Sequence, residues 1–561
     1  MLAFILGGSC VHSAHAASTS NDAHTATPIK HLIVIVGENR TFDNVFATYQ
    51  PPQGETVANL LSRGIVNKDG SPGKNFSLAA QKRAAPAHKY SAELSIAGSY
   101  GRLTPPSARG ESGEAPGPGL AADVEVPNGP FQISRYVLPG SRAGSLVHRF
   151  FQMWQQFHAG KQDLMVWVAD TADGGADEGQ NATQQASVSM GFYNMAAGDL
   201  PYFRELALHY ALADNYHQPV MGGTGANFIA IASGDVGSYN LDGKLAVPPA
   251  NQIENPDPAP GTANAYVQDG YTGGSYVNCS DPAQPGVASI RHYLSGLPYR
   301  AFNDGNCAPG ACYLVNNYEP GYRANGDRSR LGPEKYTLPP QSMPTIAERM
   351  SQNGVSWKWY AGARGDGHPA GKEYCTICDP FTHFKGVMES DLKRNLVDFG
   401  QFYSDAAAGS LPAVSFITPS DSVSGHPGYS TLAVYSDFVA GIVNHVRMNS
   451  ALWRDTAILI TFDEGGGYYD SGYVQTIDFF GDGPRVPMIL VSPHARPGYV
   501  DHTYYDHASI LKFIEKNWHL QPLSARSRDA LPNPVHGTQD PYVPQNRPAI
   551  GDLTNLLREQ K

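Results

Sequence analysis

Four short apolar runs, rich in β-branched residues, stand out along the chain. They cover residues 31–36, 413–417, 457–462 and 486–491. A run of this length that does not alternate with polar positions is typical of a strand buried on both faces of a parallel sheet. We therefore expect these four runs to form buried strands of one sheet.

Segments with helical spacing of their apolar residues lie between and beyond these runs. The clearest of them cover residues 145–157, 201–210, 431–448 and 508–518. Strands that alternate with helices indicate an α/β fold, in which a mostly parallel central sheet has helices on both faces.

Two long stretches interrupt this alternation. Residues 51–129 are rich in Gly, Pro, Ala and Ser, and residues 239–340 are rich in Asn, Gly, Pro and Tyr. We interpret both as loop-rich insertions in a single domain that spans residues 27–520, with a Pro-rich tail at residues 521–561.

Composition narrows the possible partners. The formal net charge is −11, and the 40 Lys and Arg residues are scattered without forming a basic stripe. A protein that binds nucleic acid needs a positive surface to meet the phosphate backbone, so that class is disfavoured. Past the N-terminus, no stretch approaches the roughly 20 continuous apolar residues of a transmembrane helix.

The N-terminal residues 1–16 predict export. An apolar stretch ends in Ala14-His15-Ala16, which is the small-residue pattern of a secretory cleavage site. The usual basic residues do not precede it, which leaves a truncated signal open. We expect a periplasmic or extracellular protein.

Five cysteines follow the predicted signal. They are Cys279, Cys307, Cys312, Cys375 and Cys378. Export makes disulfides chemically reasonable. The Cys375-Thr-Ile-Cys378 spacing also suits a redox or zinc pair, but no second such motif and no neighbouring βαβ pattern accompanies it, so a structural disulfide is favoured. The odd count leaves one thiol without an assigned partner.

Polar residues follow two of the predicted strands directly. Glu38 and Asn39 come after the first run, and Asp463 and Glu464, with three glycines behind them, come after the run at 457–462. Ligands of α/β sheets bind beyond the carboxyl ends of the strands, and oxygen donors suit hard divalent cations. Either pair alone is more often a turn or a helix cap, whereas both together favour a metal site.

A third polar segment contains Gly222-Gly223-Thr224-Gly225 and runs into the apolar residues 228–232. The pattern predicts a tight turn that opens a helix. A threonine at this place is commonly a plain N-cap. Its hydroxyl also lies in the positive field of the helix N-terminus, which favours an alkoxide and a bound phosphate.

Seven segments between about residues 29 and 519 carry a resemblance when they are taken in order. They read HLIVIVGENRTFDNVF, HRFFQ with AGKQD, MGFY, DNYHQPVMGGTGAN, PAVSFITP with GHP, TFDEGGGYYD, and VPMILVSPHARPGYVDHTYYDHASILKFIE. Together they resemble the bacterial phosphoesterase family, which contains phosphatidylcholine-type phospholipases C and respiratory-burst-inhibiting acid phosphatases. The resemblance implies an alkaline-phosphatase-like fold and the hydrolysis of phosphate esters.

The resemblance also implies roles for particular residues. Thr224 resembles the family's nucleophile, which becomes phosphorylated. One divalent metal ion, which could be Ca, Mg, Mn or Zn, is expected on five ligands: Glu38, Asn39, Thr224, Asp463 and Glu464. Three histidines resemble those that line the phosphate pocket, where they would bind phosphoryl oxygens or protonate the leaving group; they are His148, His383 and His426. His507 and Asn227 match positions expected to support the site from outside it.

Within the family the substrate class stays open. The chain ends soon after these segments, without the C-terminal β-domains of the larger phospholipases, which slightly favours a secreted acid phosphatase acting on phosphomonoesters. The alternative is a phospholipase C acting on phosphatidylcholine-type diesters at a membrane surface, which needs an aromatic cage for choline. Ser471 and Thr382 depart from residues found in relatives, a histidine and an acid, so the pocket could be tuned differently.

Other classes fit the sequence less well. A sulfatase needs an arginine after its Cys-x-Pro motif, and the segment from Cys307 to Ala311 has none. A serine hydrolase needs a Gly-x-Ser-x-Gly elbow, which is absent at Ser233. A non-catalytic surface-binding protein with a decayed site would lack the nucleophile or a ligand, and none is missing here.

Overall fold

The computed structural model describes residues 20–103, 126–137, 140–172, 186–258, 264, 272–365, 370–535 and 547–559. The predicted signal at residues 1–16 lies outside these ranges. Among the helices in the described ranges, none combines the length and the apolar character that crossing a bilayer requires.

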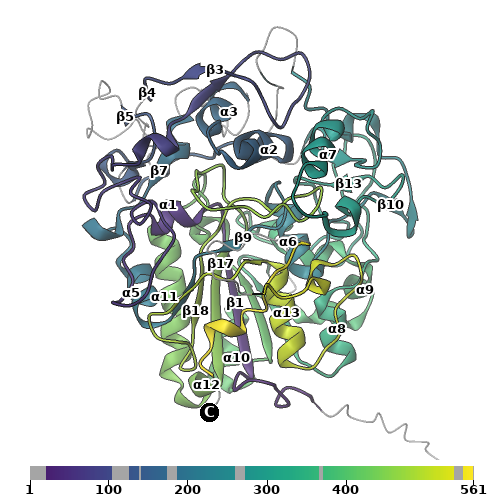
Figure 1. The fold of residues 1–561 in the computed structure, drawn as a ribbon. Helices are drawn as coiled ribbons and strands as arrows, with labels where there is room; N and C mark the ends of the chain where they lie inside the picture. Colours follow the sequence, from purple (N-terminus) through teal and green to yellow (C-terminus); the bar gives the residue numbers. More distant parts are fainter. Residues whose placement is uncertain are drawn as a thin grey trace, which may run out of the picture.

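An eight-stranded sheet forms the centre of the fold (Figure 1). Its strands, in spatial order, are β15 (Leu396–Asp398), β14 (Trp357–Ala361), β16 (Val414–Thr418), β1 (His31–Gly37), β17 (Thr456–Phe462), β18 (Met488–Val491), β8 (Ala211–Ala213) and β19 (Val500–Asp501). β1 pairs in parallel with both β16 and β17. The predicted α/β class with a mostly parallel sheet is confirmed.

One strand departs from the expected parallel arrangement. β18 forms from the predicted run at 486–491, but it is antiparallel to both β17 and β8. The chain between β17 and β18 contains no helix that could carry it back across the sheet. It therefore re-enters the sheet at the edge where β17 ends, and β18 runs in the opposite direction.

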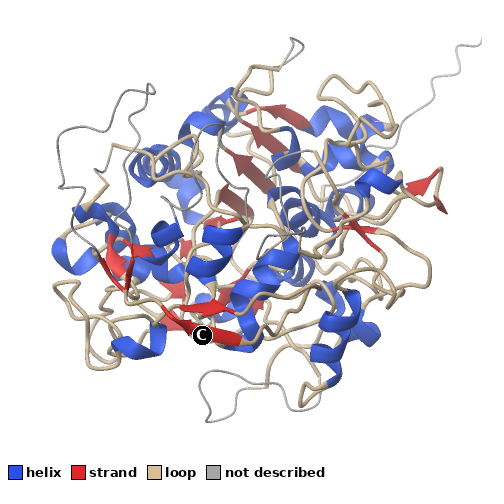
Figure 2. Cartoon of the chain, turned by 90° about the horizontal axis from the view of Figure 1, so that it is seen from above, coloured by secondary structure: helices blue, strands red, loops and turns tan. Residues whose placement is uncertain are grey.

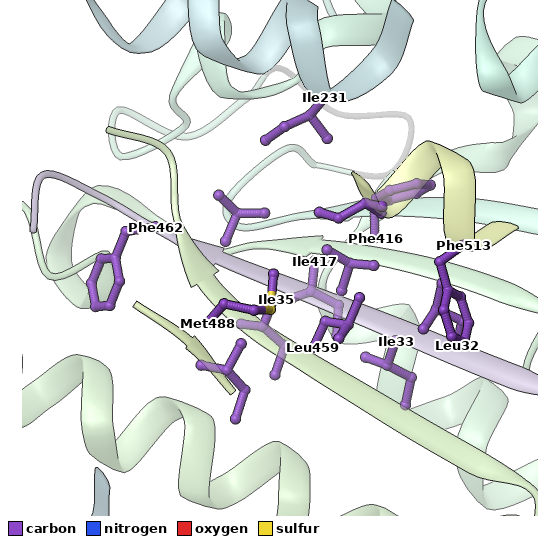
Figure 3. Packing of buried hydrophobic residues seen from close by; sticks show 14 of the residues in the cluster. Leu32, Ile33, Ile35, Ile231, Phe416, Ile417, Leu459, Phe462, Met488 and Phe513 are labelled. Atoms are coloured by element: carbon purple, nitrogen blue, oxygen red, sulfur yellow. The ribbon is translucent and has the colours of Figure 1, made fainter. Parts of the chain in front are cut away.

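Helices cover the sheet on both faces (Figure 1). One group contains α5 (Pro201–His209), α10 (Gly400–Ala408), α11 (Leu432–Met448) and α12 (Ser450–Arg454), and the other contains α6 (Thr224–Ser233), α8 (Ile346–Gln352), α9 (Lys385–Met388) and α13 (Ala508–Asn517). Figure 3 shows Ile231 of α6 and Phe513 of α13 packed with the buried side chains of the sheet. The near-continuous apolar runs are explained by this burial on both faces.

The predicted helix at 145–157 is shorter than expected. Helix α2 spans Phe150–Phe157, and the residues before it are not helical. The Phe150 amide donates to Asn316 Oδ1 at 2.8 Å, so a side chain from a distant segment fixes the start of the helix. His148 consequently lies in an extended segment rather than on a helix.

The two predicted insertions contribute to a cap beyond the carboxyl ends of β1 and β17 (Figure 1). Among the described residues, the cap includes the helices α1 (Phe42–Phe46), α2, α3 (Met165–Thr171) and α7 (Val287–Ser295). Three two-stranded sheets come from the first part of the chain: β2 (Lys82–Ala84) with β3 (Ile96–Ser99), β4 (Arg102–Leu103) with β5 (Val126–Pro127), and β6 (Phe131–Gln132) with β7 (Gly191–Phe192). Three more are β9 (Tyr216–His217) with β20 (Tyr505–Asp506), β10 (Asn240–Leu241) with β11 (Lys244–Leu245), and β12 (Tyr276–Val277) with β13 (Tyr313–Leu314). Viewed from this end, loops cover much of the molecule (Figure 2).

The described part of the predicted C-terminal tail places an arginine inside the protein. Arg528 is 4 % exposed and pairs with three buried carboxylates. Its guanidinium nitrogens lie 2.7 Å from Asp478 Oδ1, 2.5 Å from Asp482 Oδ1 and 3.3 Å from Asp506 Oδ2. One cation from the predicted tail therefore compensates three acids beneath the cap.

We predict that Arg528→Met lowers the free energy of unfolding by about 3–5 kcal/mol, because it leaves buried carboxylates without their cation. Urea unfolding followed by circular dichroism measures the change. Arg300→Met is the control, since Arg300 forms an exposed pair with Asp304 and should cost about 1 kcal/mol or less. Equal effects of the two substitutions would contradict the structural role of Arg528.

Candidate active site

Four strands deliver polar residues to the same edge of the sheet. β1 leads to Glu38, β17 to Asp463, and β16 toward His426. β8 is antiparallel to β18, as β17 is, so β8 also ends at this edge and leads toward Thr224. Segments that lie far apart in the sequence therefore meet at one place.

The segments after β1 and β17 hydrogen-bond to each other. The Arg40 amide donates to the Glu464 carbonyl oxygen at 2.9 Å, and the Asn39 amide donates to the side-chain oxygen Oδ1 of Asp463, also at 2.9 Å. Asn39 has a φ of +62°, which a non-glycine residue rarely adopts. Its side-chain amide is buried, and neither its oxygen nor its nitrogen has a hydrogen-bond partner. A strained residue with an unsatisfied buried side chain indicates a functional position.

Thr224 is the first residue of α6 and follows a turn that Asn227 holds. Asn227 Oδ1 accepts from the Val220 amide, and its Nδ2 lies within 3.2 Å of the carbonyl oxygens of Val220, Gly222 and Gly223. These contacts fix the backbone that presents Thr224. The supporting position predicted for Asn227 is thus behind the turn.

The predicted insertion at 239–340 supplies the other wall of this turn. Asn317 Oδ1 accepts from the Gly225 amide at 2.8 Å. A Cβ atom on Gly222 would lie 1.8 Å from the Val315 carbonyl oxygen, so only glycine fits there. Neither Val315 nor Asn317 is predictable from the sequence, because the irregular segment that carries them shows no periodic pattern.

Buried negative charges repel one another at this edge. Burial raises the pKa of Glu38 well above its ordinary value, and neighbouring carboxylates, Asp463 foremost, raise it further. Burial also raises the pKa of Asp463 to about 6, although the hydrogen bond from the Asn39 amide and the nearby Thr224 hydroxyl favour its charged form. Among the described residues, no arginine or lysine forms an ion pair with this carboxylate beside Thr224.

Two of the three predicted pocket histidines lie together. The rings of His148 and His426 are 6.5 Å apart, and His148 Nε2 lies 4.0 Å from Glu464 Oε1. His148 Nδ1 lies 2.5 Å from the Leu146 carbonyl oxygen, so Nδ1 carries a hydrogen and donates it.

His426 has the opposite arrangement. Its Nδ1 accepts from the Gly428 amide at 3.0 Å, so the hydrogen of the neutral ring is on Nε2. Burial, followed by the positive charges of His148 and Arg40, holds the pKa of His426 well below its ordinary value. The neutral ring can donate one hydrogen bond from Nε2.

His383 lies apart from this group. It ends the 3-10 helix η9 (Pro380–His383), which packs against α6, and neither ring nitrogen has a hydrogen-bond partner. Burial lowers the pKa of His383 to about 3. Among the hydrogen bonds and ion pairs of the described residues, none joins its side chain to Thr224 or to the edge carboxylates.

His507 supports the site from behind. Its Nε2 donates to the Asp463 carbonyl oxygen at 2.6 Å, and its Nδ1 lies 2.9 Å from the Tyr216 hydroxyl, from which it accepts. Burial lowers the pKa of His507 to about 4, which keeps the ring in this neutral form. His217, in the segment before the Thr224 turn, hydrogen-bonds the Gly483 carbonyl and stacks on Tyr504. Its contacts are structural.

Four of the five cysteines after the predicted signal form disulfides, and Ser471 binds an aspartate outside the edge carboxylates. Disulfides join Cys279 to Cys307 and Cys375 to Cys378, and Cys312 is free and buried. The disulfide prediction for the Cys375-Thr-Ile-Cys378 motif is confirmed. Ser471, at the position where relatives differ, donates from its amide and hydroxyl to Asp43 Oδ2 rather than to the edge carboxylates.

A comparison of the sequence with models of known protein families gives a match over most of the chain. A family model described as "Phosphoesterase family" matches residues 29–521. The chain belongs to this family. The match covers both strand ends, the Thr224 turn and the predicted histidines of this phosphoesterase.

Curated relatives bear two kinds of name. A probable acid phosphatase of Kluyveromyces lactis is 29 % identical over 39 % of this chain and 52 % of its own length. Non-hemolytic and hemolytic phospholipases C of Pseudomonas aeruginosa are each 22 % identical, over 66 % and 72 % of this chain and 43 % and 46 % of their own lengths. The matched part of this phosphoesterase thus spans about half the length of these relatives.

Solved structures give weaker likenesses. A protein of the alkaline phosphatase superfamily from Vibrio parahaemolyticus is 9 % identical, with a TM-score of 0.25 over 56 % of this chain and 59 % of its own. A phosphonate monoester hydrolase from Silicibacter pomeroyi is 13 % identical, with a TM-score of 0.23 over 59 % of this chain and 70 % of its own.

We predict that Gly222→Ala destabilises the phosphoesterase by about 2 kcal/mol or more, because the new methyl group meets a backbone carbonyl that cannot turn away. Urea unfolding measures the change. Gly98→Ala is the matched control, since nothing lies near its Cβ position, and it should change the free energy of unfolding by less than about 0.5 kcal/mol. A Gly222→Ala protein as stable as the wild type would contradict the packing of Val315 against this turn.

Proposed function

We propose that this phosphoesterase is an exported, metal-dependent hydrolase that cleaves phosphate esters through a phosphothreonine intermediate at Thr224. One observation carries the proposal. The Thr224 hydroxyl opens helix α6 and lies close enough to Asp463 to favour its charged form, and Asp463 is one of several buried carboxylates that repel one another. A nucleophile beside uncompensated negative charge fits a site that binds a cation and a phosphate together.

The residues at this edge fit one divalent metal ion. The ligands would be Glu38, Asn39, Thr224, Asp463 and Glu464. All of them offer oxygen donors, the buried Asn39 side chain has no other partner, and the repulsion between Glu38 and Asp463 would be relieved by a positive charge. When bound, the ion would neutralise the phosphate and favour the alkoxide form of the nucleophile.

The residues of the chain would carry out the attack on phosphorus, the proton transfer to the leaving group and the stabilisation of charge. Thr224 Oγ1 forms a bond to phosphorus while the ester P–O bond breaks, and a histidine transfers a proton to the departing oxygen. Water then attacks the phosphorus and releases Thr224. Helix α6 begins at this hydroxyl, and its N-terminal field stabilises the negative charge of the transferred group.

The histidines differ in what they can donate. The neutral His426 ring offers a hydrogen bond from Nε2, which suits a phosphoryl oxygen. His383 has two ring nitrogens without partners, and His148 Nε2 points toward the edge carboxylates. We propose His148 as the proton donor to the leaving group, and the neutral His383 and His426 as residues that bind phosphoryl oxygens.

Both substrate classes have support. The preference for a phosphomonoester rests on the sequence and on relatives named acid phosphatases. The second candidate, a phospholipase C acting on a choline-type phosphodiester, is favoured by relatives of that name whose matches cover 66 % and 72 % of the chain. Two disulfides agree with an exported protein in either case.

We predict that Thr224→Ala lowers kcat by about 10⁶-fold, as expected for loss of a nucleophile, while Thr224→Ser keeps part of the activity. Hydrolysis of p-nitrophenyl phosphate and of p-nitrophenylphosphorylcholine, side by side, measures the rates. A chelator should abolish activity, and Ca²⁺, Mg²⁺, Mn²⁺ or Zn²⁺ should restore it.

Faster cleavage of the monoester would indicate a phosphatase, and faster cleavage of the choline diester a phospholipase C. Trapping of ³²P-phosphate on the wild type but not on Thr224→Ala identifies the intermediate. An active Thr224→Ala protein, or full activity after complete metal removal, would refute the mechanism.

We predict that His426→Asn slows good and poor leaving groups by the same factor, because a neutral Nε2–H binds phosphate without giving up its proton. Removal of the proton donor, by His148→Asn, should cost about 10²–10⁴-fold on the poorer leaving group and less on p-nitrophenol. A series of aryl and alkyl phosphates measures this dependence. A steeper dependence in His426→Asn alone would reverse the assignment.

A further inference from the structure

The Cys375–Cys378 disulfide lies directly beside the candidate active site. Cys378 Sγ is 3.7 Å from Glu38 Oε1, although 340 residues separate them in the sequence. One ligand atom from each of Glu38, Cys375 and Cys378 can be chosen so that all three lie within 4.8 Å of one another. A carboxylate and two sulfur atoms are therefore already gathered at one point.

These distances suit a tetrahedral zinc ion once the sulfur–sulfur bond is open. With Zn–S about 2.3 Å and Zn–O about 2.0–2.2 Å, a sulfur and an oxygen ligand lie roughly 3.5 Å apart and two sulfur ligands roughly 3.8 Å apart. The Cys378–Glu38 distance already has this length. Only the two sulfurs must separate, and the 3-10 turn η8 (Thr376–Cys378) between them is short.

The disulfide is also placed where it can be reached. Cys378 is buried at 2 % exposure against Glu38, whereas Cys375 is partly exposed. The residues on either side of Cys375, which are Tyr374 and Thr376, line a cavity of about 830 Å³. Cys375 itself does not line the cavity, but it is partly exposed, so a small thiol reaches it from solvent more readily than it reaches the buried Cys378.

We propose that Glu38, Cys375 and Cys378 form a binding site for Zn²⁺, or a similar thiolate-seeking divalent cation, whenever the Cys375–Cys378 disulfide is open. Disulfide formation closes this site. It then leaves Glu38 to the edge of the sheet, so the two uses of Glu38 exclude each other. This last consequence rests on the proposed function, in which Glu38 is a ligand of the catalytic metal.

The chemistry needs a reductant of a common class. A dithiol attacks Cys375, and a second exchange releases both cysteine thiols and leaves the dithiol as its own cyclic disulfide, so that two electrons and two protons reach the protein. Metal binding then replaces the two thiol protons, which pass to solvent. A newly made chain whose disulfide has not yet formed needs no reductant.

Cobalt(II) is the probe for this site, because a thiolate ligand gives Co²⁺ a charge-transfer absorption that oxygen and nitrogen ligands do not give. The full-length protein is reduced with a dithiol, freed from the reductant and titrated with Co²⁺. We expect one equivalent to bind with a thiolate band, Zn²⁺ to displace it, and the oxidised protein to show no band. The Cys279Ser/Cys307Ser protein should keep the band, since it retains the Cys375–Cys378 pair.

Two variants test the assignment. The Cys375Ser/Cys378Ser protein should lose the band while its circular dichroism stays native. Glu38→Gln should weaken Co²⁺ binding by at least about 10-fold, because loss of an outer-shell partner alone costs that much. A band that survives the double cysteine substitution, or its absence in reduced wild type whose two thiols react with a thiol reagent, would overturn the proposal. Unchanged affinity in Glu38→Gln would remove Glu38 from the site.

The test separates this inference from the proposed function. The cobalt band reports binding and needs no catalysis, so a band in a protein that hydrolyses neither phosphate ester would support the zinc site and refute the function. If both hold, further Zn²⁺ added to protein that already holds its catalytic metal should inhibit the reduced form, and it should inhibit the oxidised form at least about 10-fold less. Equal inhibition of both forms would show that Glu38 is not shared between the two sites.

Discussion

The structure depends on negative charge that is buried at one edge of the sheet, where the described residues supply Glu38 and Asp463 with no arginine or lysine partner. Elsewhere buried arginines compensate the acids: Arg485 pairs with Asp43 and Asp470, Arg364 with Asp379, Arg149 with Glu254, and Arg528 with three aspartates. The contrast supports a partner ion from outside the protein for the edge carboxylates.

Rigid elements hold these repelling groups together. β1 and β17 pair in register as far as Gly37 and Phe462, so the next residues of both strands emerge side by side. The Asp463 amide donates to the Gly37 carbonyl oxygen at 3.0 Å, and His507 binds the Asp463 carbonyl from the other side. Because the strands and α13 carry these contacts, the carboxylates cannot relieve their repulsion by moving apart.

Features of the fold that depend on neighbouring residues could be predicted from the sequence, whereas features that depend on contacts between distant segments could not. Fully buried strands need apolar residues on both faces, so the runs at 31–36 and 457–462 can be recognised as strands from the sequence alone. The polar residues directly after them are then placed at the strand ends. The direction of β18 depends on a connection without a helix, and the start of α2 depends on the distant Asn316 side chain. Contacts of this kind leave no periodic trace in the sequence.

The insertion at 239–340 is the clearest example, because three consecutive residues of it hold two parts of the site. The Val315 carbonyl packs on Gly222 and the Asn317 side chain binds the Gly225 amide, so both fix the turn before and after Thr224. Asn316 caps α2 and thereby positions the segment of His148. Thr224, the proposed nucleophile, and His148 are thus held by the same three residues of the insertion.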